Sequence, residues 1–97
     1  MSLAESDRKF EGYQDELEQL RRRARLSVTV NECLEIRDRV QDILEDEDFY
    51  DTRGISDKVI IYRAAMEVYR PLVDSLATFG KEAEGMRKSL GRLVGKG

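Results

Sequence analysis

The chain contains no histidine and no tryptophan, and it has a single cysteine, Cys33, and a single proline, Pro71. Without histidine, it lacks the most common general base, the usual partner of a nucleophilic serine or cysteine, and the most common metal ligand. No Walker, G-x-S-x-G or G-x-G-x-x-G pattern is present either. We therefore expect a protein that is not an enzyme and uses no cofactor. A lone cysteine is typical of a reducing compartment, which predicts a cytoplasmic location.

An excess of charge of one sign is also lacking. Asp, Glu, Lys and Arg make up 38% of the 97 residues, yet the formal net charge is only −3. No global field would therefore draw the chain to nucleic acid or to an anionic membrane. The sequence also lacks an apolar run of membrane-spanning length and a secretory signal at its start. We expect one soluble domain over residues 1–97, which can be a piece of a longer protein.

Apolar residues recur at steps of three and four, and this spacing predicts three helices. The first is expected over about residues 4–25. One of its faces carries Phe10, Tyr13, Leu17, Leu20 and Ala24. Two ion pairs are predicted on outward helix faces from i,i+4 spacing. They are Glu18 with Arg22 in this helix and Glu35 with Arg39 in the next.

The second helix is expected over about residues 30–48, after a short β-branched stretch that has no partner strand. Thr29 and Glu32 have the spacing of a capping box, and Val28 and Cys33 lie where a hydrophobic staple would pack. Cys33 falls on the apolar face of this helix. It is therefore interpreted as a buried structural thiol, with a reactive thiol as the alternative.

Periodicity stops at residues 45–48, which are four consecutive acids. An EF-hand alignment starting at Asp46 lacks the oxygen ligand, the glycine and the final glutamate that this loop requires. We therefore expect a solvated acidic turn, with weak cation binding or docking of a basic partner as alternatives. The next residues are too apolar for a solvated loop, and at least two of Phe49, Tyr50 and Ile55 are expected to close one end of the core.

The third helix is expected over about residues 57–94, capped by Ser56 or Asp57. One heptad register runs through it without a change of phase: Tyr62, Ala65, Tyr69, Leu72, Leu76, Phe79, Ala83, Met86, Leu90 and Leu93. Because the phase does not reset at Pro71 or Gly80, we expect one long helix kinked at the proline. The alternatives are two helices that meet near Arg70 and a helix that ends at Gly80. The predicted fold is all-α, an antiparallel three-helix bundle in up-down-up order with a long, Pro-kinked C-terminal helix.

The last helix is too long for this bundle. At 1.5 Å per residue it would span about 55 Å, against about 33 Å and 28 Å for the first two. Its distal part would overhang and expose an apolar stripe, which favours association with another helix. The candidate partner-binding residues are Leu76, Phe79, Ala83, Met86, Leu90 and Leu93. The sequence thus predicts a helical interaction or scaffold module that forms a homo-oligomer, a homodimer in the simplest case, by coiled-coil-like packing.

Two basic segments support alternative functions. Residues 81–97 form a basic amphipathic stretch, which would suit a peripheral membrane or vesicle-trafficking adaptor. Residues Arg21–Arg25 hold four arginines, which would suit weak nucleic-acid binding, although no aromatic residues interleave with them. In layout, the expected bundle resembles spectrin-type repeats and the N-terminal domains of vesicle-fusion proteins.

Overall fold

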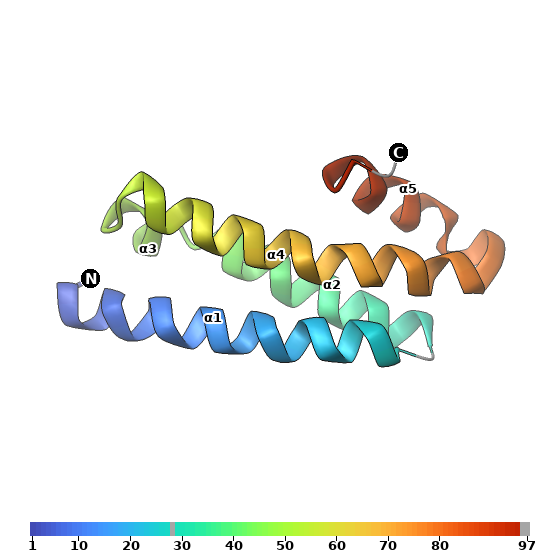
Figure 1. Cartoon of the computed structure of the whole chain (residues 1–97), viewed down its shortest axis with the longest axis horizontal. Coiled ribbons are helices and arrows are strands. Elements are labelled where there is room, and N and C mark those ends of the chain that lie inside the picture. The colour runs from blue at the N-terminus through green and yellow to red at the C-terminus, as the bar shows by residue number, and fades with distance from the viewer. Residues whose placement is uncertain (28, 96–97) are drawn as a thin grey trace.

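The computed structural model describes residues 1–27 and 29–95, and most of these residues are helical. The elements are α1 (Leu3–Leu26), α2 (Val30–Leu44), α3 (Glu47–Asp51), α4 (Ile55–Leu76), the 3-10 segment η1 (Ala77–Ala83) and α5 (Glu84–Leu93). Helices α1, α2 and α4 run antiparallel in up-down-up order, in a molecule of 45 × 22 × 16 Å (Figure 1). The predicted helical bundle is confirmed.

Side-chain caps fix the starts of α2 and α3. The Thr29 hydroxyl accepts a hydrogen bond from the Glu32 amide at 3.1 Å, so this half of the predicted capping box is confirmed. Val28, the other predicted staple residue, lies outside the described residues. The Asp46 carboxylate accepts from the Phe49 amide at 3.3 Å and thereby starts α3. The second helix consequently ends before the acidic run rather than within it.

Phe49 closes the end of the core that lies near the N-terminus. Its ring is fully buried, and it packs edge-on against Tyr13 and Tyr50, with centroid distances of 5.2 and 5.1 Å. Tyr50 is half-buried against the same core, whereas Ile55 is exposed. The prediction that two of three apolar residues close this end is confirmed for the two aromatic ones.

The start of α4 differs from the prediction. Gly54 is the N-cap residue and supplies no side-chain hydrogen bond, so a cap by Ser56 or Asp57 is wrong. Asp57 instead accepts a hydrogen bond from Arg53 at 3.1 Å. The carboxylate that could have capped the helix is therefore used to hold the preceding turn.

The single long last helix over residues 57–94 is also wrong. Helix α4 continues through Pro71, as expected, but it ends at Leu76. At Gly80 the backbone has φ 69° and ψ −143°, and α5 folds back along the C-terminal half of α4 (Figure 1). Glycine adopts this conformation without a Cβ clash, and the fold-back buries an apolar stripe that a straight helix would expose to water.

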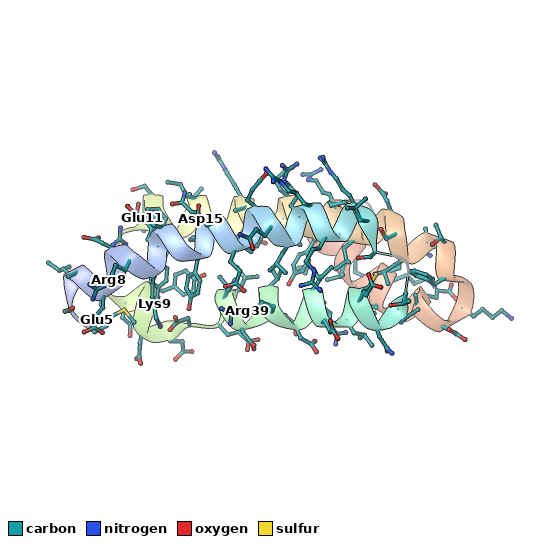
Figure 2. All side chains as sticks on the ribbon, turned by 90° about the horizontal axis from the view of Figure 1, so that it is seen from below. Glu5, Arg8, Lys9, Glu11, Asp15 and Arg39 are labelled. Carbon is teal, nitrogen blue, oxygen red and sulfur yellow. The ribbon has the colours of Figure 1, made fainter. Side chains whose placement is uncertain are left out.

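Some ion pairs link two helices rather than neighbouring turns of one helix. Arg39 forms a bidentate pair with Glu16 of α1, and in Figure 2 it extends from α2 toward α1. The predicted partner, Glu35, lies 3.7 Å from Arg23 instead. Arg39 therefore bridges two helices, because the α1–α2 interface brings Glu16 closer than its own turn brings Glu35. The predicted pair of Glu18 with Arg22 is confirmed at 3.5 Å.

Candidate functional site

The predicted partner-binding residues are largely covered by the chain itself. Leu76, Ala83 and Leu90 are buried in the core. Phe79 and Met86 are half-buried against it, and Leu93 is exposed. Since α5 folds back, these residues form no overhanging stripe. The overhang predicted for the last helix is therefore wrong, and partner binding by these residues stays a prediction.

Exposed apolar residues gather instead on α4. Residues 59–62 are four consecutive apolar residues, of which only Ile61 is buried. Tyr62 is 50% exposed, although its heptad position predicted a core residue. A ridge of apolar side chains runs along this helix at steps of four, three and four, formed by Ile55, Val59, Tyr62 and Met66. Such spacing places all four on one face of α4.

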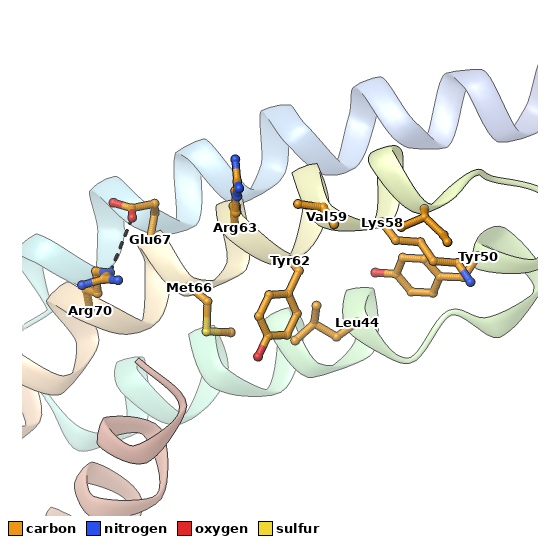
Figure 3. Close-up of a pocket in the computed structure, with 10 residues that line it drawn as sticks. Leu44, Tyr50, Lys58, Val59, Tyr62, Arg63, Met66, Glu67 and Arg70 are labelled. Atoms are coloured by element: carbon orange, nitrogen blue, oxygen red, sulfur yellow. Dashed lines mark ion pairs between the residues drawn. The ribbon is translucent and has the colours of Figure 1, made fainter. Parts of the chain in front are cut away.

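This ridge forms one wall of an open groove with a volume of about 950 Å³. The opposite wall is formed by Leu44 from the end of α2 and Tyr50 from α3 (Figure 3). Tyr62 and Met66 point to the side of α4 that faces Leu44. From Ile55 to Met66 the ridge is about 17 Å long, the length of three helical turns.

Tyr50 is a fixed part of this wall. Its hydroxyl donates a hydrogen bond to the Ile43 carbonyl at 2.9 Å, which satisfies the polar end of the ring. Burial, together with the nearby Tyr13 and Asp46, raises the pKa of Tyr50 to about 12. The side chain is therefore neutral at physiological pH and presents an apolar ring to the groove.

The rim of the groove is predominantly basic. It carries Lys58, Arg63 and Arg70 and one carboxylate, Glu67, which lies 3.5 Å from Arg70 (Figure 3). The Lys58 ammonium is 5.9 Å from the centre of the Tyr50 ring, a weak cation–π contact. Among the residues that the structure describes, Arg63 forms no hydrogen bond or ion pair. Its positive charge is available to a ligand.

The arginine cluster near the end of α1 is engaged in intramolecular contacts. Arg21 and Arg22 both pair with Glu18, and Arg23 lies near Glu35. Ala24 is buried, which confirms that the arginines project away from the core side of the helix. The cluster has the arrangement expected of charges on an outer helix face.

Cys33 and Asp46 of the acidic run are both engaged in structural contacts. Cys33 is fully buried, and desolvation raises the pKa of its thiol, which disfavours the reactive thiolate. Asp46 is occupied by Lys9, Tyr13 and the Phe49 amide. Across residues 1–27 and 29–95, no group of three or more His, Cys, Asp or Glu side chains could hold a metal ion.

The groove was not identified from the sequence, although a signal for it exists. One helix face can bury only part of a run of four consecutive apolar residues such as 59–62. The rest are left exposed or line a second surface. Which of the four is buried depends on how α4 is rotated against α1 and α2, and the sequence does not specify that rotation.

Comparison with known proteins adds no relative. No family model, no curated protein and no solved structure matches the chain. Of the helices that the structure describes, none is long and apolar enough to cross a bilayer.

Proposed function

We propose that the protein is a non-enzymatic interaction module that binds an amphipathic helix of a partner protein in the groove between α4, α2 and α3. The observation that carries this proposal is an apolar ridge, three helical turns long and exposed at Ile55, Val59 and Tyr62, beside a basic rim. The proposal keeps the helix-to-helix association predicted from the sequence. It moves the binding surface from the last helix to the first half of α4.

The groove has the shape that helix recognition needs. A partner helix that presents apolar residues at steps of three and four could lay them between the α4 ridge and the wall of Leu44 and Tyr50. Tyr62, which is half-exposed, supplies a large contact area at low conformational cost, and Met66, which is 8% exposed, lines the floor of the groove beside it. Both residues lie on the partner-facing side of α4.

The charged residues at the rim of the groove determine which kind of partner helix can bind. Lys58 and Arg63 have no carboxylate partner among the described residues, while Glu67 is balanced by Arg70. An acidic helix would pair with the first two side chains, whereas a basic helix would be repelled by them. The expected partner is therefore an amphipathic helix with Leu-type residues on one face and Asp or Glu along its flanks.

Binding of a designed peptide tests this function. The probe is a fluorescein-labelled helical peptide with a leucine stripe and glutamate flanks, and its partner probe carries lysines at the flanking positions. We expect the acidic peptide to bind with a dissociation constant on the order of micromolar, and the basic peptide to bind at least about tenfold more weakly. Fluorescence anisotropy at physiological salt measures both.

Two alanine variants localise the binding. Tyr62→Ala should weaken acidic-peptide binding about tenfold, because a central aromatic residue typically dominates such an interface. Ile60→Ala is the matched control, since Ile60 is on the same helix and is similarly exposed but does not line the groove. Equal weakening by both variants, or no binding of either peptide by the unmodified protein, would overturn the proposal.

A further inference from the structure

The connection between α4 and α5 contains a single residue that reverses the chain. Within η1, Gly80 departs most from helical dihedrals, at φ 69° and ψ −143°, and Ala83 at the end of the segment has φ −106° and ψ 0°. No other residue in the described segment 55–94 has a positive φ. The reversal of the chain is therefore concentrated at Gly80.

The apolar pattern on either side of this hinge fits both arrangements. Leu72, Leu76, Phe79, Ala83 and Met86 keep the same steps of three and four across Gly80. A sequence that only needed to turn back would have no reason to keep that phase. Straightened at Gly80, residues 55–93 would form one helix with a continuous apolar stripe.

The contacts of α5 are mainly with the two elements that precede it along the chain. Helix α5 packs on α4 and η1, and Ala83, Leu90 and Val94 join the common core from this side. These contacts can be made equally well by α5 from another copy, because the α4 surface that receives them is identical. A straight helix of about 58 Å would carry α5 well beyond the body of its own chain, whose longest dimension is 45 Å.

We propose that two copies of this chain exchange α5 by straightening at Gly80. In the exchanged dimer, α5 of each copy lies on α4 of the other, and the two long helices run antiparallel through the hinge region. Phe79 and Met86, which are half-buried in the monomer, lie beside this hinge and would pack against their counterparts. The partner is thus a second copy, and the surface is distinct from the α4 groove.

The balance between monomer and exchanged dimer depends on the hinge. Most contacts are the same in both forms. The monomer is therefore favoured by the translational entropy of two separate chains, and the dimer is favoured by release of any backbone strain at Gly80. Glycine makes the turn nearly free of strain. A side chain at position 80 would meet no atom within 4 Å, so it would act through φ alone.

The variant Gly80→Ala tests the exchange. Alanine disfavours φ 69° and favours a continuous helix, so the association constant should rise at least about tenfold relative to the unmodified protein. Gly85→Ala is the matched control, because Gly85 lies inside α5 with a negative φ and open space at its Cβ position. Light scattering after gel filtration measures the mass, and small-angle scattering detects the longer dimer.

The outcomes are decisive in both directions. A folded Gly80→Ala variant that stays monomeric at high concentration, or one that dimerises no more than Gly85→Ala, would overturn the proposal. If Gly80→Ala does not fold, the unmodified protein is tested instead. It is incubated at high concentration near the temperature of its unfolding midpoint, then cooled and diluted. A dimer that persists after dilution supports exchange, and recovery of monomer alone overturns it. Tyr62→Ala, which acts on the groove, should leave the exchanged dimer unchanged.

Discussion

Asp46 shows how much one residue of a charged turn can determine. Its carboxylate accepts hydrogen bonds from the Tyr13 hydroxyl at 2.5 Å, the Lys9 ammonium at 2.9 Å and the Phe49 amide at 3.3 Å. It therefore joins α1 to the start of α3, beside the ring that closes the core. Among four consecutive acids, only the fold distinguishes this one from its neighbours.

Replacing Asp46 should make stability depend less on pH. Burial alone would raise the pKa of this carboxyl, but the hydrogen bonds from Tyr13, Lys9 and Phe49 outweigh it and lower the pKa. A lowered pKa in the folded state means that the carboxylate stabilises the fold above its unfolded pKa of about 3.9, and that this contribution disappears as pH falls through the folded value. We expect Asp46→Asn, which retains a cap acceptor, to cost about 1 kcal/mol at neutral pH and nearly nothing in strong acid.

Urea unfolding at neutral and acidic pH measures this difference. Asp48→Asn serves as the control, because Asp48 is exposed and makes no hydrogen bond or ion pair within the described residues. A loss for Asp46→Asn that is the same at both pH values would show that its charge does not contribute.

At the scale of elements, ion pairs report how α1 and α2 are aligned. Spacing along α2 alone favours Arg39 with Glu35, yet Arg39 pairs with Glu16 across the interface. The alignment of two helices can therefore override a local i,i+4 pattern.

A pair of double-mutant cycles separates these two pairings. The coupling between Glu16→Gln and Arg39→Gln should be about 0.2–1 kcal/mol in free energy of unfolding, as for partly exposed pairs, and it should fall in high salt. The coupling between Glu35→Gln and Arg39→Gln should be close to zero. The reverse order of the two couplings would mean that α1 and α2 are aligned differently.

At the scale of the whole molecule, the fold-back of α5 decides which surface is left for a partner. It buries Leu90 to 2% exposure, while Leu93 remains 52% exposed on the same helix. Most of the apolar stripe predicted from the heptad register is thereby covered, whereas the groove beside α4 keeps several apolar residues exposed. This is why the proposed binding surface lies on the first half of α4.

Truncation of these two leucines tests the fold-back directly. Leu90→Ala should lower the free energy of unfolding by about 2–4 kcal/mol, because it removes buried apolar atoms and leaves a cavity. Leu93→Ala should change it by no more than about 0.5 kcal/mol. Chemical denaturation at low protein concentration, which disfavours association, provides the measurement. Equal and small effects would indicate that α5 does not pack on its own chain.

The sequence by itself determined the local features of this protein. The periodicity of apolar residues specified three main helices in a bundle, the Thr29 cap specified the start of α2, and the position of Cys33 specified a buried thiol. These follow from helix geometry and from hydrogen bonds between residues three or four apart. No distant part of the chain is needed to decide them.

The tertiary structure alone decided the break at Gly80 and the location of the groove. A heptad register that continues across a glycine is compatible with a straight helix or with a folded-back one, because the spacing of apolar residues does not specify what covers them. The choice depends on whether a receiving surface exists elsewhere in the fold, and α4 provides it. The exposure of Tyr62 likewise depends on how α4 is rotated in the bundle, which is a property of packing among three helices rather than of any one segment.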